Sequence, residues 1–237
     1  MRLLLLSNSA APGRGYLEHA ADALAWALAG AKRVVFVPFA LADHAAYTAT
    51  VAGTLTRFGV EVTGLHTGPE RSLIESADAI FIGGGNTFRL VDALYRRDLI
   101  DPIRAAVVSG VTYLGSSAGT NVATPSLKTT NDMPIVQPPS FDTLGLVPFQ
   151  INPHYLDPDP DSSHQGETRD ERILQFHEEN ATPVLAMREG TWLRREADSL
   201  SLEGLHAGAR LYRAGQATQE LPTPTRLDEL LRQPSVS

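Results

Sequence analysis

Short apolar runs alternate with helix-like segments through the first half of the chain, and this alternation strongly constrains the fold. The runs are Leu3–Leu6, Val34–Val37, Ala79–Ile82 and Val111–Leu114, with a weaker one at Val60–Leu65. The segments between them place apolar residues at helical spacing over Tyr16–Leu28, Tyr47–Phe58, Thr87–Tyr95 and Pro102–Val108. Runs that are apolar at successive positions are typical of strands buried on both faces. The pattern predicts an α/β protein with a mostly parallel sheet and helices on both faces.

The second half of the chain shows this alternation less clearly. Eight prolines between residues 125 and 160 indicate a long irregular segment, a kind of segment that often carries function. A helix is expected over Arg169–Glu179, and strands over Val184–Met187, Trp192–Arg194 and Ala209–Arg213. Because there is no internal repeat and no obvious linker, residues 1–237 are interpreted as a single domain. Residues 216–237, with three prolines, are expected to form a loosely held tail.

Composition limits the class of function. The formal net charge of -7 and the pI near 5.5 argue against nucleic acid or an anionic membrane as the main partner. The absence of cysteine excludes disulfides, thiolate catalysis and cysteine-based zinc sites. The first apolar run ends at Leu6, short of the roughly 7–15 apolar residues of a signal peptide, and no run approaches the ~18 of a membrane span. We therefore expect a soluble, cytoplasmic protein.

The pentapeptide Gly115–Gly119 follows the last apolar run directly and has the form G-x-S-x-G. At the end of a strand, such a turn lifts the central serine, here Ser117, above the sheet edge, and the small flanking residues allow the sharp bend. The same string also occurs in plain turns. The motif makes Ser117 a candidate nucleophile whose partners must be found elsewhere in the chain.

A serine nucleophile needs a base, usually a histidine, and a carboxylate that orients the base. His154 follows a short apolar run and a proline, a strand-end position that faces the ligand-binding edge of a parallel sheet. Glu189 comes directly after the run Val184–Met187. A structural histidine and a charged hairpin residue are the ordinary interpretations of these two positions. The order Ser117, His154, Glu189 differs from the Ser–acid–His order of α/β-hydrolases, which argues against that fold.

A second glycine cluster, Gly83–Asn86, also joins a strand to a helix. It fails the dinucleotide fingerprint because Phe88 stands where the last glycine is needed, and no Gly-Lys-Ser/Thr follows it. A loop with free backbone amides that binds an oxyanion or a carboxylate is one interpretation, and a tight turn is the other. The acidic string Asp157–Asp161 lacks the later glycine and glutamate of a calcium loop, so no metal and no cofactor is expected.

Arg169 lies at the start of the expected helix Arg169–Glu179, where Thr168 and Glu171 fit a capping box. An arginine at this place offers a two-pronged hydrogen-bonding group to a carboxylate. A solvated helix terminus is the alternative.

Together, these motifs resemble the peptidase E family of α-aspartyl dipeptidases, a serine-peptidase group that also contains cyanophycinase. The resemblance extends from Met1 to about Arg213. Its segments, all in one order, are Leu3–Ser9, Val37–Ala40, Gly83–Phe88, Gly115–Gly119, Thr129–Val136, Gln150–His154 and Gly166–Arg169.

The resemblance implies a fold like the class I glutamine-amidotransferase domain (flavodoxin-like) and a Ser–His–Glu triad at Ser117, His154 and Glu189. It also implies an oxyanion hole from the backbone amides of Gly85 and Ala118. Its substrate-binding residues map to Arg169, for the side chain of an amino-terminal aspartate, and to Asn86. Asp132 maps to a position that binds substrate or organises the loop. Ser116 departs from the family pattern, in which bacterial relatives carry a tryptophan, a change that can alter the pocket wall without touching the chemistry.

The function implied is hydrolysis of Asp-Xaa dipeptides through an acyl-enzyme on Ser117, in a homodimer without a cofactor. The partners are then small dipeptides. Two alternatives remain: a cyanophycinase-like hydrolase of aspartyl-arginine peptides, and a non-catalytic amino-acid-binding protein on the same fold.

Overall fold

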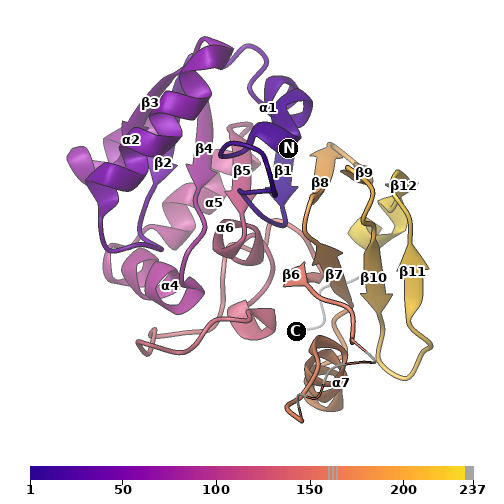
Figure 1. Ribbon diagram of the computed structural model, residues 1–237. Helices are drawn as coiled ribbons and strands as arrows, with labels where there is room; N and C mark the ends of the chain where they lie inside the picture. Colours follow the sequence, from indigo (N-terminus) through magenta and orange to yellow (C-terminus); the bar gives the residue numbers. More distant parts are fainter. Residues whose placement is uncertain (160, 162, 164, 233–237) are drawn as a thin grey trace.

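The alternating runs of the first half form the parallel part of an eight-stranded sheet (Figure 1). The computed structural model describes residues 1–159, 161, 163 and 165–232. The parallel strands are β1 (Arg2–Leu6), β2 (Arg33–Val37), β3 (Glu61–Gly64), β4 (Ala79–Ile82) and β5 (Thr112–Ser116). Three antiparallel strands extend the sheet beyond β1: β8 (Thr191–Glu196), β9 (Ser199–Gly204) and β12 (Thr225–Arg226).

The strand order is β12-β9-β8-β1-β5-β4-β2-β3. The stretch β3-β2-β4-β5 follows the first four strands of the flavodoxin order, and β1 holds the place that the last parallel strand holds in flavodoxin. The carboxyl ends of β1, β4 and β5 therefore lie side by side at one edge of the sheet. The expected α/β class with a mostly parallel sheet is confirmed.

Helices cover both faces of the sheet, as the uninterrupted apolar strands predicted. Their bounds are α1 (Ala21–Ala27), α2 (His44–Leu55), α3 (Glu70–Glu75), α4 (Thr87–Arg96), α5 (Ile100–Val108), α6 (Ala118–Asn121) and α7 (Arg169–Glu179). Short 3₁₀ turns cover Glu18–Ala20, Thr56–Phe58, Leu65–Thr67, Leu127–Thr129 and Asp228–Arg232. Leu4 and Leu6 pack with α1 and α2, whereas Leu3 and Leu5 pack with α4 and α5, because successive side chains of a strand point to opposite faces.

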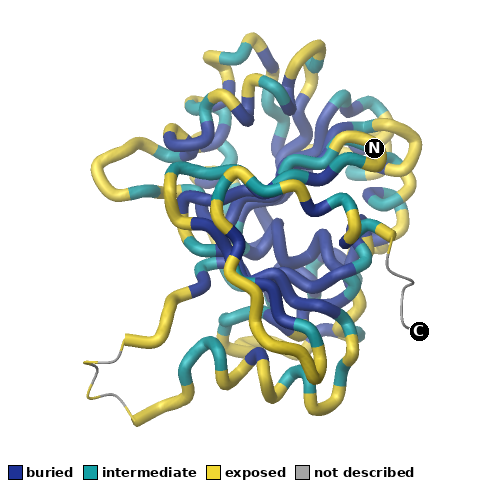
Figure 2. Tube along the Cα trace, turned by 90° about the vertical axis from the view of Figure 1, so that its right-hand side faces the viewer, coloured by how far each residue is buried: buried dark blue, intermediate teal, exposed yellow. Residues whose placement is uncertain are grey.

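A second, four-stranded sheet has the order β11-β10-β7-β6 and carries α7 on one face (Figure 1). Its strands are β6 (Gln150–Tyr155), β7 (Val184–Arg188), β10 (Ala209–Tyr212) and β11 (Gln219–Leu221). Its other face joins the main core through Ile151, Leu185 and Leu211. The dark-blue interior of Figure 2 shows this continuous buried centre.

The chain beyond residue 215 differs from the expectation of a loosely held tail. β11 pairs with β10 and β12 pairs with β9, and Leu221, Leu227 and Leu230 are buried. Pro222 and Pro224 lie between β11 and β12, so they interrupt the strands without preventing their burial. The last part of the expected tail, residues 233–237, lies outside the described residues. The interpretation as one domain stays a prediction.

Candidate active site

Ser117 lies between the end of β5 and the start of α6, at the expected sharp turn. Its backbone has φ 55° and ψ -111°, a strained conformation that non-glycine residues rarely adopt. Its N–H donates to the Leu6 carbonyl at 3.1 Å, which fixes the turn to the end of β1. Gly119 contacts the chain of β4 so closely that a Cβ there would lie 2.0 Å from the Ile82 carbonyl oxygen. The glycine that closes the motif is therefore required by packing.

His154 lies near the end of β6 and also has a positive φ, of 53°. The pairing of β6 with β7 is irregular between Asn152 and Tyr155, so the strand bends at this point. The His154 N–H donates to the Ser7 hydroxyl at 2.9 Å, and this hydroxyl donates in turn to the Met187 carbonyl at 2.9 Å. Nε2 of His154 is 2.8 Å from the Ser117 hydroxyl oxygen.

Glu189 follows β7, and its Oε1 is 2.6 Å from Nδ1 of His154. A proton on Nδ1 lets the ring donate to this carboxylate and accept the Ser117 hydroxyl proton at Nε2. The Glu189 side chain is 49% exposed, so water reaches the carboxylate. The next residue, Gly190, donates its N–H to Oδ1 of Asn8 at 2.8 Å. The structure thus brings Ser117, His154 and Glu189 into one hydrogen-bonded chain.

The Gly83–Asn86 loop passes directly beside Ser117: a Cβ on Gly84 would lie 3.0 Å from the Cβ of Ser117. Gly85 has φ 133°, and a Cβ there would lie 2.6 Å from the Ala40 carbonyl oxygen, so no other residue fits. Within the described part of the chain, the N–H groups of Gly85 and Ala118 have no hydrogen-bond partner. Two backbone donors thus remain available near the serine.

A cavity of about 250 Å³ opens at Ser117 and His154 and is lined further by Thr87, Ala118, Thr130, Asn131, Asp132, Pro153 and Arg169. Arg169 begins α7 behind the expected capping box of Thr168 and Glu171, which is present. Burial lowers the pKa of the Arg169 guanidinium, as does Arg172, while Asp132 opposes this shift. The cavity therefore contains one cationic and one anionic side chain beside the serine.

Asp132 organises the loop beneath the cavity. Its Oδ2 accepts hydrogen bonds from the Thr87 N–H at 2.7 Å, the Thr87 hydroxyl at 2.6 Å and the Thr130 hydroxyl at 3.1 Å. None of the hydrogen bonds made by the described residues reaches Oδ1. One oxygen of this carboxylate therefore remains for a ligand.

Asn86 and Ser116 do not line the cavity. Oδ1 of Asn86 accepts the Arg89 N–H at 3.0 Å and caps α4, and its Nδ2 donates to the Met133 carbonyl at 2.9 Å. Substrate binding by Asn86 stays a prediction that these contacts do not support. Ser116 has no exposed surface and does not line the cavity, because β5 directs it into the interior. Its side chain therefore forms no part of the cavity wall.

Ser7 and Asn8, which support His154 and the Glu189 turn, were not assigned a role from the sequence. Both are almost fully buried at the end of β1. The signal that could have found them is a polar pair directly after a fully apolar strand, at the same sheet edge as Ser117.

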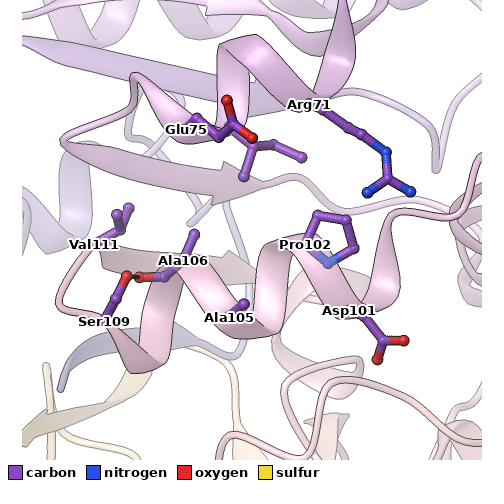
Figure 3. A pocket seen from close by; sticks show the side chains of 9 residues that line it. Arg71, Glu75, Asp101, Pro102, Ala105, Ala106, Ser109 and Val111 are labelled. Atoms are coloured by element: carbon purple, nitrogen blue, oxygen red, sulfur yellow. Dashed lines mark hydrogen bonds between the residues drawn. The ribbon is translucent and has the colours of Figure 1, made fainter.

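A larger groove of about 620 Å³ lies between α3 and α5 (Figure 3). Arg71 and Glu75 extend from one helix, and Asp101 and Ala105 from the other. The Ser109 hydroxyl donates to the Ala106 carbonyl at 2.8 Å. The groove contains none of the expected site residues. It reaches Val111, next to the amino end of β5, whereas Ser117 follows the carboxyl end.

Comparison with known proteins identifies the family of the chain. The model of "Peptidase family S51" matches residues 3–203. "Peptidase E" of Streptomyces coelicolor is 58% identical over 232 residues, which cover 98% of this chain and 95% of that protein. The "Probable alpha-aspartyl dipeptidase" of Drosophila melanogaster is 52% identical over 234 residues, 97% of each chain.

A crystal structure of a peptidase from an acI-B1 Actinobacterium superposes with a TM-score of 0.69 and 18% identity, covering 95% of this chain and 96% of that one. This likeness concerns the fold. A family match over most of the chain and two relatives above 50% identity support one conclusion: the chain belongs to peptidase family S51.

Proposed function

We propose that this protein is a serine dipeptidase that hydrolyses dipeptides with an amino-terminal aspartate. The observation that carries the proposal is the hydrogen-bonded chain Ser117–His154–Glu189 at a small cavity containing Arg169. The names of the two relatives, peptidase E and probable alpha-aspartyl dipeptidase, support the same activity.

In the proposed reaction, the Ser117 hydroxyl attacks the scissile carbonyl while Nε2 of His154 takes its proton. The protonated His154 then gives the proton to the leaving amine, and a water molecule repeats the sequence on the acyl-enzyme. Glu189 holds the ring in the required tautomer and stabilises its positive charge. The amides of Gly85 and Ala118 stabilise the oxyanion, an effect of about 2.7–4 kcal/mol for each donor in comparable sites.

Substrate recognition in this proposal uses both charges in the cavity. The substrate's amino-terminal aspartate carries a carboxylate and an α-ammonium group. Arg169 pairs with the carboxylate, and the unpaired Oδ1 of Asp132 accepts a hydrogen bond from the ammonium. A cavity of about 250 Å³ favours a short substrate.

The first experiment measures turnover of Asp-Leu by the wild-type protein and by Ser117→Ala, with Ser116→Ala as the matched control. We expect Ser117→Ala to lower kcat by about 10⁴-fold or more, because the nucleophile is lost. The control should retain turnover, because Ser116 lies outside the cavity. A Ser117→Ala protein with wild-type turnover would remove the serine from the mechanism.

The second experiment compares kcat/KM for Asp-Leu, Asn-Leu and Glu-Leu. A site that pairs a carboxylate should discriminate against Asn-Leu by orders of magnitude, because the cation is then left unpaired. Arg169→Met should abolish this preference. Arg172→Met, which removes a half-exposed arginine one turn along α7, should leave it intact. Equal values for all three substrates would argue against the assignment of Arg169.

A panel with β-Asp-Arg and N-acetyl-Asp-Leu tests the rest of the proposal. Preferred cleavage of β-Asp-Arg would favour the cyanophycinase-like alternative. Failure of a serine-directed fluorophosphonate to label the protein would favour a binding protein. Cleavage of N-acetyl-Asp-Leu as fast as Asp-Leu would exclude the role of Asp132.

We also propose a cytoplasmic homodimer, which rests on the family resemblance. Sedimentation velocity tests the dimer, and cell fractionation tests the location. Among the described residues, no helix is both long enough and apolar enough to cross a membrane.

A further inference from the structure

A cluster of charged and aromatic side chains lies on the second sheet, outside the cavity. Arg188 of β7 directs its guanidinium onto both oxygens of Asp157, at 2.7 Å each, and also onto Glu220. Arg210 of β10 contacts the same two carboxylates, at 3.2 Å and 3.0 Å. Both guanidinium groups lie 5.7 Å from the centre of the Tyr155 ring. The cluster therefore joins β6, β7, β10 and β11 through side chains.

Asp170 links this cluster to α7. Its Oδ1 accepts hydrogen bonds from the hydroxyls of Tyr155 and, at 2.5 Å, of Tyr212. Its Oδ2 accepts one from Arg210 at 3.1 Å. Burial, and then the hydrogen bond to Asp170, raise the pKa of Tyr212 to about 12. Three donors from two strands thus fix one carboxylate in the first turn of α7.

Three members of the cluster are direct sequence neighbours of the candidate site residues. Tyr155 follows His154, Asp170 follows Arg169, and Arg188 precedes Glu189. A side chain held by several partners also restrains the backbone of its own residue, and this restraint extends to the residue next to it. The cluster is placed to hold the backbone at all three site residues simultaneously.

Arg169 depends on this support more than the other two. His154 and the Glu189 turn are also held by Ser7 and Asn8, through backbone hydrogen bonds. Every described residue between 156 and 167 is exposed, and the cluster holds this loop at Asp157, near its start, rather than next to α7. Asp170 joins the first turn of α7 to the second sheet, one turn before Ile173, which is buried against Tyr155 and Tyr212.

We propose that Asp170 is a positioning residue for substrate selectivity: its bonds to Tyr155, Tyr212 and Arg210 hold the start of α7 so that Arg169 faces the cavity. This inference rests on the proposed function, in which Arg169 pairs with the substrate carboxylate. Without the bonds of Asp170, the start of α7 can shift and carry Arg169 with it. This shift weakens the ion pair between Arg169 and the substrate carboxylate more than it affects the reaction at Ser117 and His154.

The test uses Asp170→Asn, which keeps the size of the side chain and removes its charge. The matched control is Glu220→Gln. Glu220 also contacts Arg210, and in addition Arg188, but it makes no contact with α7. We expect the Asp-Leu over Asn-Leu preference to fall about 10- to 100-fold in Asp170→Asn, mainly through KM, the scale of loss that a misplaced binding group causes. The preference in Glu220→Gln should stay within about twofold of wild type, because Glu220 is largely solvated. Tyr212→Phe, which removes one donor and keeps the ring, should lose a smaller share of the preference.

The outcomes separate this inference from the proposed function. A wild-type protein without a preference for Asp-Leu would defeat both. A selective wild type with an equally selective Asp170→Asn variant would defeat the positioning role alone. If Asp170→Asn lowers kcat/KM for Asp-Leu, kcat/KM for Asn-Leu and the rate of fluorophosphonate labelling by equal factors, the effect is a general structural one. This outcome would also overturn the positioning role. If Asp170→Asn does not fold, an unchanged preference in Tyr212→Phe overturns the inference.

Discussion

The two sides of the candidate site are built by different means. The side with Ser117, Gly85 and Ala118 is held by the backbone: strand ends, close-packed glycines and main-chain hydrogen bonds to neighbouring strands. The side with Arg169, where α7 meets the second sheet, is held by ionic and aromatic side chains on several strands. His154 and Glu189 lie between these sides and receive support from both.

This difference has a physical consequence. A close-packed backbone contact has no room to adapt, so a single added atom displaces a strand. A half-exposed ionic cluster has several partners and access to water, so the loss of one member is partly compensated. We therefore expect the backbone-built side to be the more sensitive to substitution.

Gly119→Ala should have the largest effect on stability. The added Cβ would lie 2.0 Å from the Ile82 carbonyl oxygen and 2.7 Å from its carbon, both in the backbone of β4. Relief requires movement of a central strand, so we expect a loss of about 3 kcal/mol or more in the free energy of unfolding, measured with urea. Gly53→Ala in α2 is the control, because no atom lies within 4 Å of its Cβ, and it should gain about 0.4–1 kcal/mol. Two variants of equal stability would contradict the backbone-built interpretation.

Arg188→Gln should cost less, about 1 kcal/mol, because its partners Asp157 and Glu220 are half-exposed. Arg188 lowers the pKa of both carboxyl groups, so the stability it provides is present above their unfolded-state values, about 4. That stability is lost as the pH falls further, through the folded-state values. Urea titrations at pH 7 and pH 3 should therefore differ more for the wild type than for Arg188→Gln. An equal pH dependence would show that the ionic cluster adds nothing to folding.

The same division explains what the sequence alone could predict. Requirements of the backbone leave local signals: the apolar runs located the five parallel strands of the main sheet, and the two glycine strings located Ser117 and the Gly83–Asn86 loop. His154 and Glu189 were expected at strand ends, but their pairing was inferred from the family resemblance. The hydrogen-bonded arrangement of these side chains depends on how two sheets pack.

The ionic cluster could not be predicted in this way. Its members extend from Tyr155 to Glu220, and each alone has the pattern of an ordinary surface charge or a half-buried tyrosine. Ser7 and Asn8 act on residues about 150 to 180 positions away. The short strands near the carboxyl end were missed because the prolines between them indicate irregular chain, while their burial depends on pairing with β9 and β10.

His19, in the short turn before α1, should make the stability of the protein depend on pH in a second range. It is 5% exposed and packs against Trp192. Burial lowers its pKa, so the unfolded chain binds a proton before the folded protein does. Stability should therefore fall as the pH drops below the unfolded-state value of about 6.5, well before the carboxyl groups titrate. Urea midpoints between pH 8 and pH 5 should change less in His19→Leu than in wild type. If the urea midpoints of the two proteins changed equally with pH, protonation of His19 would not lower the free energy of unfolding.

Ser116→Ala should have the smallest effect, and of the opposite sign. The Ser116 hydroxyl is fully buried and has no hydrogen-bond partner within the described chain. Removing an unsatisfied buried hydroxyl ends a desolvation cost, so we expect a gain of up to about 1 kcal/mol. Ser7→Ala is the matched comparison, because Ser7 is equally buried at the end of the neighbouring strand but makes hydrogen bonds to Met187 and His154. It should lose about 1–3 kcal/mol and reduce turnover, since the His154 N–H is left without an acceptor. If both serines proved equally replaceable, the hydrogen bond from His154 to Ser7 would not be part of what holds the site.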